Sequence, residues 1–423
     1  MNTLERILSY ENLNLAYKQV FRNKGASGID TMQVEELKPF LQNHIEDIRS
    51  AILSGAYYPQ SVRGIFIPKS GSDEKRLLGI PTVVDRFIQQ AIHQVLYDVF
   101  DPEFSEFSYG FRKGKNAQQA VLQALEYANS GFHYVVDIDL SKFFDRVNHD
   151  YLMSLIAKKI HDKELLRLIR RYLQSSIMIN GVKQERREGT PQGSPLSPLL
   201  SNILLNELDK ELTKRGHRFV RYADDFSIYV KTKVSAQRVM RSLRRFIENK
   251  LHLQINEKKS SVRYAGHMKL LGYGIYRTRK QTFALKVTNE SWQRFKNKCK
   301  QITRKTKPFS LEYRVAKLKE LGRGWINYFK FANIKQRLSR LDNWLGSRLR
   351  YCIFKTWKRI RTRIRNLKRL GVPLPLAIKW GLNRKGGWHL VHTPIFTTTI
   401  TNERLKQRGF LPMSDIYMKL QNK

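Results

Sequence analysis

Acidic residues set within apolar strand patterns constrain this chain more than any other feature. In the segment 134–140, Asp137 and Asp139 alternate with valine, isoleucine and leucine. Successive side chains of a strand point to opposite faces, so both carboxylates share one face and the apolar side chains share the other. Like charges this close repel and are costly to desolvate unless a cation or hydrogen-bond donors neutralise them. The segment therefore predicts a strand that carries a charged site.

A second acidic pair, Asp224 and Asp225, separates the apolar runs 219–222 and 226–230, a pattern typical of a hairpin. Either pair alone is more often an ordinary turn or strand end than a metal site. Side by side, they would offer hard oxygen ligands to two Mg²⁺ ions about 4 Å apart, which activate an attacking hydroxyl and stabilise a leaving phosphate. The predicted chemistry is nucleotidyl transfer.

The net charge of +42, from 78 basic and 36 acidic residues, requires an acidic partner. Residues 291–423 hold 33 of the basic and 5 of the acidic side chains. Over 338–370 the basic residues alternate with apolar ones at helical spacing, so one face packs and the other stays positive. Nucleic acid fits this pattern better than a membrane surface, and better than a merely solvated basic surface.

The remaining composition favours a cytoplasmic protein. Cys299 and Cys352 are the only cysteines, so neither a disulfide framework nor a cysteine zinc module is expected. The first residues lack the basic and apolar segments of a signal peptide, and no run of about 18 apolar residues could span a bilayer. We therefore expect no membrane partner.

Local patterns predict the order of the main elements. Helices are expected over 85–100, 117–129, 150–175 and 199–215, and a basic hairpin is expected over 61–80 with its turn at 69–73. After residue 274 the pattern changes to long basic helices, and Pro373 and Pro375 mark a boundary near residue 371.

Several sequence blocks in order resemble those of reverse transcriptases. The blocks at 139–145, 190–198 and 222–225 resemble the first carboxylate motif, the loop against the incoming nucleotide and the metal-binding box of that family. The blocks at 78–82 and 108–112 resemble those of the branch encoded by bacterial group II introns. Single motifs match by chance, but an ordered set makes chance negligible.

The resemblance extends over about residues 20 to 390. Arg323-Gly324-Trp325-Ile326-Asn327-Tyr328-Phe329 is similar to the maturase, or X, region of the group II intron branch. Ser194 stands where many relatives repeat glycine, which is a small change. No cluster of His and Cys of the kind that builds an HNH endonuclease is found near the C-terminus, as in the compact group IIC class. We therefore expect target-strand cutting to be absent.

By this resemblance, Asp139, Asp224 and Asp225 are expected to bind two Mg²⁺ ions, together with the backbone carbonyl of Leu140. Asp137 is interpreted as structural.

The same resemblance implies a set of nucleotide-binding residues. Phe144 would lie under the sugar of the incoming nucleotide, where its ring excludes a 2′-OH and so selects dNTPs. Lys69 and Arg76 of the basic hairpin would bind the triphosphate, although without the resemblance each is an ordinary surface cation. Gln192 and Gly193 would contact the nucleotide, with glycine allowing close backbone approach.

Two further elements are implied. Lys259, chosen over Lys258, would protonate the leaving pyrophosphate. Leu271, Gly272 and Tyr273 resemble the primer grip, although a simple strand explains them nearly as well.

The expected fold is α+β, a right-handed arrangement of fingers, palm and thumb with an antiparallel palm sheet and a helical basic thumb. We expect an N-terminal extension at 1–30, fingers at 31–115, a palm with inserted fingers helices at 116–288, a thumb or X domain at 289–370 and a basic C-terminal DNA-binding region at 371–423.

The function implied is that of a nucleoid-associated bacterial reverse transcriptase and maturase of a mobile intron. Its partners would be group II intron RNA, an RNA template with a DNA or RNA primer, target DNA and dNTPs. The same polymerase recruited to host DNA repair or phage defence stays an alternative, as does a splicing-only maturase, although the intact acidic sites argue against the latter. The sequence leaves the particular intron, the DNA target and homodimerisation open.

Overall fold

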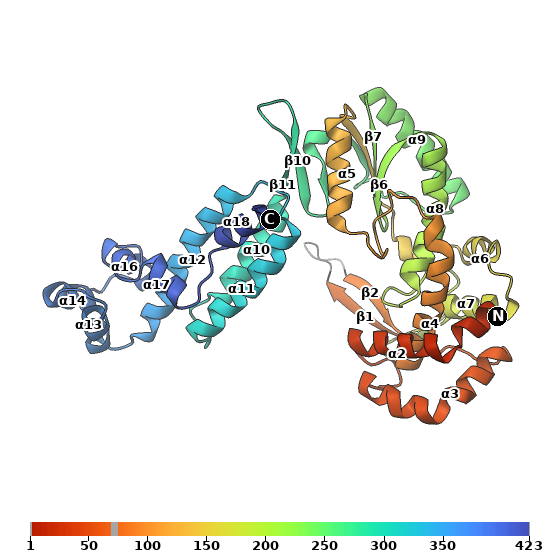
Figure 1. Cartoon of the computed structure of the whole chain (residues 1–423), viewed down its shortest axis with the longest axis horizontal. Helices are drawn as coiled ribbons and strands as arrows, with labels where there is room; N and C mark the ends of the chain where they lie inside the picture. Colours follow the sequence, from red (N-terminus) through yellow and green to blue (C-terminus); the bar gives the residue numbers. More distant parts are fainter. Residues whose placement is uncertain (1, 69–74, 423) are drawn as a thin grey trace. The chain divides into compact units, whose positions relative to one another are not determined.

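The computed structural model describes residues 2–68 and 75–422, which divide into two compact units, Met1–Ala265 and Gly266–Lys423. The first unit combines helices with two mixed or antiparallel sheets, and the second is mainly helical (Figure 1). This confirms the predicted α+β class. No helix in the described ranges is both long and apolar enough to cross a bilayer.

The helices of the first unit largely follow the predicted patterns. They are α1 (Thr3–Ile7), α2 (Tyr10–Asn23), α3 (Leu37–Leu53), α4 (Val83–Phe100), α5 (Ala117–Asn129), α6 (His149–Ala157), α7 (Lys163–Gln174), α8 (Ser197–Lys214) and α9 (Lys233–Lys250), with 3-10 turns at Val34–Glu36, Asp101–Glu103 and Phe143–Asp145. Polar N-caps begin several of them: the Thr82 side chain accepts a hydrogen bond from the amide of Asp85 at the start of α4.

The helix expected over 150–175 was wrong in one respect. The first helix, α6, ends at Ala157, and a second helix, α7, begins at Lys163. The Asp162 carboxylate caps α7 by accepting a hydrogen bond from the amide of Leu165. An N-cap aspartate satisfies an otherwise unpaired amide at a helix start. Asp162 therefore favours a new helix start at this point over a continuous helix.

One sheet of the first unit carries both acidic sites. Its strands β3 (Tyr134–Ile138), β6 (Arg218–Tyr222), β7 (Asp225–Val230) and β8 (Ser261–Tyr264) lie in the order β6-β7-β3-β8, and all neighbours are antiparallel. Val136 and Ile138 belong to the core that also contains the apolar side chains of α8 and α9. Strand alternation therefore leaves Asp137 on the opposite face, away from α9.

The second sheet contains the predicted basic hairpin. Strands β1 (Val62–Pro68) and β2 (Lys75–Ile80) pair antiparallel, and β1 also pairs in parallel with β4 (Ile177–Ile179), which is followed by β5 (Val182–Gln184). The hairpin is confirmed, while its tip at 69–74 lies outside the described residues. Lys69 falls in this segment.

The second unit begins with a small sheet and continues as helices. Its elements are the strands β9 (Lys269–Leu270), β10 (Tyr273–Arg277) and β11 (Phe283–Val287), and the helices α10 (Asn289–Ile302), α11 (Leu311–Tyr328), α12 (Lys335–Thr356), α13 (Ile360–Arg369), α14 (Leu374–Gly381), α15 (Gly387–Leu390), α16 (Pro394–Thr399), α17 (Asn402–Gln407) and α18 (Met413–Gln421), with a 3-10 turn at Ala265–His267 at the junction of the units. The basic helical pattern over 338–370 is confirmed, but it forms two helices, because α12 ends at Thr356 with Trp357 as its C-cap and α13 begins at Ile360.

The C-terminal helix returns to the middle of the second unit. The Asp342 carboxylate, on α12, accepts hydrogen bonds from the amides of Met413 at 2.7 Å and Ser414 at 2.9 Å, at the start of α18. A carboxylate at a helix N-terminus satisfies unpaired amides and interacts favourably with the helix dipole. The predicted finer domain boundaries stay predictions, and the one division that the structure has falls between Ala265 and Gly266.

Candidate active site

The turn between β6 and β7 presents the second acidic pair. Tyr222 pairs with Asp225, so Ala223 and Asp224 form a two-residue turn. Ala223 has a positive φ of 59°, which is the backbone conformation that a type II′ turn requires at its first central residue. Alanine there costs roughly 1 kcal/mol relative to glycine. The surrounding structure therefore has to hold this turn in place.

The sheet register brings the two acidic sites together. Ile138 pairs with Phe226, so the next residues, Asp139 and Asp225, follow on neighbouring strands. Desolvation, followed by the charges of Asp224, Asp139 and Asp137, raises the pKa of Asp225 to about 6. Desolvation also raises the pKa of Asp224, with Asp139 contributing. These carboxylates, distant in sequence, thus form one electrostatic cluster.

Asp139 is held by the segment that precedes β8. Its amide donates to Ser260 Oγ at 3.0 Å, and its carbonyl accepts from the amide of Asn256 at 2.8 Å. Lys259 Nζ lies 3.8 Å from Asp139 Oδ2 and is largely exposed. The structure therefore brings Lys259 to the carboxylate cluster, while its role as a proton donor stays a prediction.

The backbone at Leu140 offers a further oxygen. Leu140 bridges to Ile255, and the flanking hydrogen bonds run from Ser141 N to Gln254 O and from Asn256 N to Asp139 O. Since the residues on both sides of Leu140 bond toward the segment that contains Ile255, the Leu140 carbonyl points to the opposite edge of its strand. For Leu140 that edge is the side on which β7 lies.

Asp137 has a different environment from Asp139. It pairs with Ser227 in the sheet, and its Oδ2 lies 3.4 Å from the guanidinium of Arg263. Desolvation raises the pKa of Asp137, and Arg263 opposes this shift. An ion pair with its own cation agrees with the interpretation of Asp137 as structural.

The loop at 190–198 is fixed to two predicted site elements. The amide of Thr190 donates to the carbonyl of Phe144 at 2.6 Å, and the amide of Gly79, on β2, donates to the carbonyl of Gln192 at 2.8 Å. Gly193 has a φ of 116°, and a Cβ there would lie 2.9 Å from the Gly79 carbonyl oxygen. The sequence needs glycine at this position because the loop approaches β2 closely.

Arg76 and Phe144 lie around the same cluster. Arg76, on β2, lowers the pKa of Asp224, against the larger effect of desolvation. Phe144 is half-buried and meets the ring of the buried Phe143 edge-on. This agrees with the prediction that Phe143 is the core residue of the two and leaves Phe144 available to a ligand.

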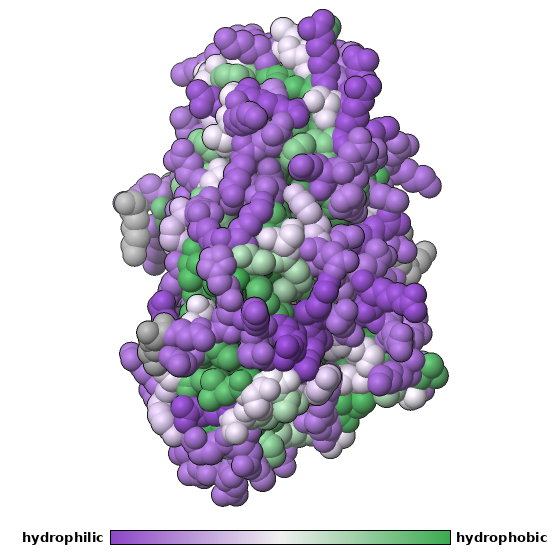
Figure 2. Space-filling view, turned by 90° about the vertical axis from the view of Figure 1, so that its right-hand side faces the viewer, coloured by the Kyte–Doolittle hydropathy of each residue, from purple (hydrophilic) through white to green (hydrophobic). Residues whose placement is uncertain are grey.

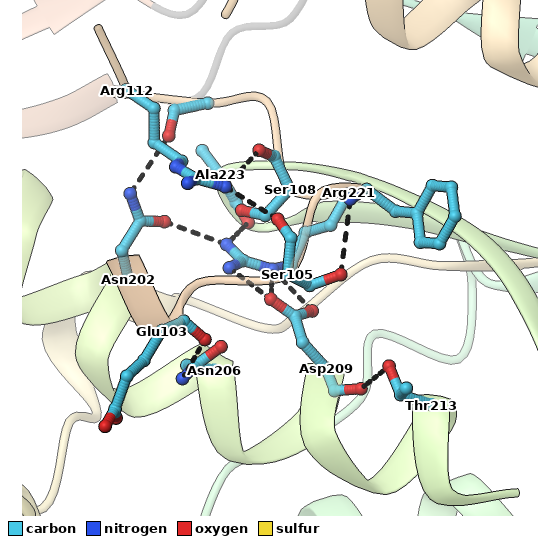
Figure 3. Close-up of polar contacts among 12 residues, drawn as sticks. Glu103, Ser105, Ser108, Arg112, Asn202, Asn206, Asp209, Thr213, Arg221 and Ala223 are labelled. Atoms are coloured by element: carbon cyan, nitrogen blue, oxygen red, sulfur yellow. Dashed lines mark hydrogen bonds and ion pairs between the residues drawn. The ribbon is translucent and has the colours of Figure 1, made fainter. Parts of the chain in front are cut away.

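A buried ion pair behind the turn was not predicted. Arg221 and Asp209, on β6 and α8, are both fully buried, with Arg221 Nη2 2.6 Å from Asp209 Oδ2 and Arg221 Nε 2.9 Å from Asp209 Oδ1 (Figure 3). Arg221 Nη1 also donates to the carbonyl of Ala223 at 3.1 Å and to Asn202 Oδ1 at 2.9 Å. Arg221 thus binds the strained residue immediately before Asp224.

The block at 108–112 is joined to the same network. The Asn202 amide donates to the carbonyl of Gly110 at 2.9 Å, and a Cβ on Gly110 would lie 2.2 Å from the backbone nitrogen of Ala223. Arg112 donates to the carbonyls of Ser105 and Ser108 (Figure 3). The block therefore packs against the acidic turn, which explains its glycine.

Sequence signals for this network existed. Asp209 interrupts the apolar face of α8 between Leu208 and Leu212, and Arg221 interrupts the apolar run of β6. Opposite charges at positions that should be buried are expected to pair. The pairing partner, however, depends on how α8 packs against β6.

The predicted primer-grip residues belong to the second unit. Leu271 and Gly272 have φ values of 51° and 85°, and form a tight turn before β10. The hydroxyl of Tyr328 donates to the carbonyl of Leu271 at 2.9 Å, and the Tyr273 hydroxyl donates to the Tyr328 carbonyl. The turn is therefore well fixed within its unit, and its role stays a prediction.

The cluster suits a hard cation in chemistry. Three carboxylates and a directed backbone carbonyl are the oxygen ligands that Mg²⁺ prefers. In the parts of the chain that the structure describes, no three His, Cys, Asp or Glu side chains converge closely enough to share an ion. Carboxylates this near one another repel, and a bound cation would neutralise that repulsion. The residues present thus fit a divalent ion, with Arg76 and Lys259 available for a polyphosphate.

Two family models match the chain. Residues 67–275 match the reverse transcriptase (RNA-dependent DNA polymerase) family, and residues 292–371 match the group II intron, maturase-specific domain. The first match contains every residue of the carboxylate cluster. The second lies wholly in the basic helical unit.

Individual relatives agree with these matches. Group II intron-encoded protein LtrA of Lactococcus lactis subsp. cremoris is 30% identical over 326 residues, which cover 62% of this chain and 54% of LtrA. Protein YkfC of Escherichia coli strain K12 is 29% identical over 68% of this chain and 86% of its own length. The chain thus spans about half of LtrA.

Solved structures that match are more distant. A partial Cas6-RT-Cas1–Cas2 complex is 25% identical over 59% of this chain and 43% of that chain, with a TM-score of 0.38. Apo telomerase from Candida tropicalis is 14% identical over 54% of this chain and 55% of that chain, with a TM-score of 0.41.

The buried ion pair gives a first prediction. Arg221→Met leaves the Asp209 carboxylate buried without its partner, so we expect the free energy of unfolding to fall by about 3–5 kcal/mol in urea denaturation. Arg167→Met breaks the surface pair with Glu164 and should cost less than about 1 kcal/mol.

A double variant separates stability from positioning. Arg221→Met combined with Asp209→Leu removes both buried charges, so most of the lost stability should return. Both the single and the double variant lack the hydrogen bond from Arg221 to the Ala223 carbonyl. We therefore expect both to extend a primer on an RNA template more slowly than the wild type. Full recovery of extension in this double variant would show that Arg221 does not position the turn.

The raised pKa of Asp225 gives a second prediction. Its folded pKa of about 6 exceeds the value of about 4 in an unfolded chain, so its ionisation opposes folding above pH 6 and has no effect below pH 4. Asp225→Asn should therefore raise the melting temperature of the metal-free protein by a few degrees at pH 7.5.

The pH dependence is the control for this effect. The difference in melting temperature between Asp225→Asn and wild type, measured in EDTA, should shrink as the pH falls from 7.5 to 4. Asp98→Asn removes an exposed carboxylate that pairs with Arg6 and should give no such gain. An equal gain at both pH values would contradict the electrostatic explanation.

Proposed function

Since the chain belongs to the reverse transcriptases that carry a group II intron maturase-specific domain, we propose that it is the RNA-directed DNA polymerase and splicing maturase of a group II intron. It would copy RNA into DNA from a DNA or RNA primer, with dNTPs as substrates. The observation that carries the proposal is the electrostatic cluster of Asp139, directly after β3, with Asp224 in the β6–β7 turn and Asp225 at the start of β7.

The polymerase reaction assigns a task to each part of the cluster. Two Mg²⁺ ions, when bound by the three aspartates and the Leu140 carbonyl, would activate the primer 3′-hydroxyl and stabilise the leaving pyrophosphate. Arg76 would bind the triphosphate, because a guanidinium can donate two parallel hydrogen bonds to phosphate oxygens. Lys259, beside Asp139, would supply the proton to the leaving group.

The nucleotide would be bound between the loop at 190–198 and Phe144. The hydrogen bonds from Gly79 to Gln192 and from Thr190 to Phe144 support this assignment, because they fix the loop to β2 and to the first carboxylate motif. An aromatic ring beneath the sugar would exclude a 2′-OH by steric contact.

Maturase activity rests on the second unit. Its helices match the maturase-specific domain and carry most of the excess positive charge. Phosphate contacts from such helices would bind intron RNA and the template–primer duplex by shape. Target DNA binding by residues 371–423 and a bacterial, nucleoid-associated location complete the proposal.

A direct test uses one metal ligand. Asp224→Asn should lower primer extension on an RNA template at least about 100-fold, because losing a ligand removes several kcal/mol of transition-state stabilisation and about 1.4 kcal/mol is tenfold. Asp98→Asn should extend at the wild-type rate. If Asp224→Asn and the wild type extend the primer equally, the assigned site is wrong. If the wild type promotes splicing without any extension, the protein is a splicing-only maturase.

Sugar selection has its own test. Phe144→Val removes most of the ring beneath the sugar, so incorporation of rNTPs relative to dNTPs should rise at least tenfold in single-nucleotide extension. Phe143→Leu alters the adjacent buried ring, and we expect it to affect stability without changing this ratio. An unchanged ratio in Phe144→Val would place sugar selection elsewhere.

A further inference from the structure

A basic groove runs along α9 and the end of α8. It has a volume of about 550 Å³, and its lining consists of Arg215, Arg238, Arg241, Ser242, Arg245, Phe246, Asn249 and Lys250. None of the lining residues that the structure describes is acidic. The face of the molecule on the right-hand side of Figure 1, where α9 lies, is largely hydrophilic (Figure 2).

The arginines form one face of the helix. Arg238, Arg241 and Arg245 are spaced by three and four residues, so they lie on the same side of α9, and all three are exposed. Arg238 and Arg245 are seven positions apart, which is about 10 Å along the helix axis. In duplex DNA each strand has a phosphate about every 3.4 Å of the helix axis, and a row of this length can reach more than one phosphate on a backbone of similar spacing.

Among the residues that the structure describes, the cations of this row have no carboxylate partner. Arg215 pairs with Glu211, and Arg244, on the neighbouring side of α9, pairs with Glu257. Across the described residues, by contrast, no ion pair to a carboxylate involves Arg238, Arg241, Arg245 or Lys250. A row of exposed cations without partners keeps its full attraction for a polyanion.

The groove lies away from the carboxylate cluster. The apolar side of α9, with Val239, Leu243 and Ile247, packs in the core that contains Val136 and Ile138 of β3. Asp139 and Asp225 project from the opposite face of that sheet. A ligand in the groove is therefore separate from the substrates of polymerisation.

We propose that this groove, the α9 groove, binds the backbone of structured RNA outside the polymerase site. The proposal rests on the proposed function, in which the protein binds a large intron RNA. The arginines would contact phosphates, while the Asn249 amide offers the donor and acceptor that a 2′-OH requires, and the Ser242 hydroxyl, whose oxygen accepts from Arg215 Nη1 at 2.6 Å, can still donate. The wide, shallow minor groove of A-form RNA exposes its 2′-hydroxyls to such a row of side chains.

A membrane surface does not fit the α9 groove. An interfacial helix needs an exposed apolar face, but the apolar face of α9 is buried in the core. Phe246, at the edge of the groove, is only half-exposed.

The test compares two variants of the full chain that lose the same charge. The first carries Arg238→Gln, Arg241→Gln and Arg245→Gln, and glutamine retains helix propensity. The matched control carries Lys18→Gln, Lys158→Gln and Lys183→Gln, three exposed lysines in α2, at the end of α6 and in β5. Circular dichroism melting verifies that both variants fold.

The probe is a hairpin-rich RNA of about 100 nucleotides without a primer, titrated at several salt concentrations. Because each lost phosphate contact removes about 0.7–0.9 from the slope of log K against log salt, the α9 variant should lose about 2–3 from that slope. Its affinity should fall at least tenfold, while extension of a short RNA template–primer stays at the wild-type rate.

Other outcomes would overturn the proposal. Equal slopes for the two variants would show that the row has no phosphate contacts. Equal losses on a DNA hairpin of the same sequence would identify a general polyanion surface instead of an RNA site. Slowed extension of the short template–primer would place the arginines in the polymerase reaction. Because binding is read without catalysis, these outcomes are distinguishable from a failure of the Asp224→Asn test.

Discussion

Repulsion among Asp139, Asp224 and Asp225 is the constraint around which the first unit is built. Unneutralised carboxylates favour separation, yet the sheet register places two of them on adjacent strands and the third in the connecting turn. The opposing force comes from buried contacts behind the turn, where Arg221 is bound to α8 and to the Ala223 carbonyl. These contacts thus hold the turn that carries Asp224 in place.

The acidic sites and the hairpins could be predicted because their signals are local. Strand alternation at 134–140 and the apolar runs around Asp224 need no knowledge of tertiary packing. The break between α6 and α7 also has a local signal, the N-cap Asp162, which the helical pattern concealed. The roles of Lys259 and Leu271 came from the resemblance, since no periodicity distinguishes them from surface or turn residues.

What the sequence could not give is pairing between distant segments. Arg221 and Asp209 are each a charged residue at a position that the apolar pattern predicts to be buried. Their pairing follows only from the packing of α8 against β6. The same holds for Gly110 and Gly193, whose need for a missing Cβ arises from the backbones of Ala223 and Gly79. The α9 groove similarly requires knowing which side of a basic helix faces the core.

The division at Ala265 has a consequence for how the protein is made. Every residue of the carboxylate cluster precedes it, so a ribosome synthesises the whole sheet β6-β7-β3-β8 before most of the basic helices. N-terminal domains generally fold first during synthesis. The sheet nevertheless cannot be completed until its edge strand β8 emerges, because that strand and the segment before it flank Asp139. Slow translation of the residues that follow Ala265 would therefore give the first unit time to fold before the strongly basic second unit is complete.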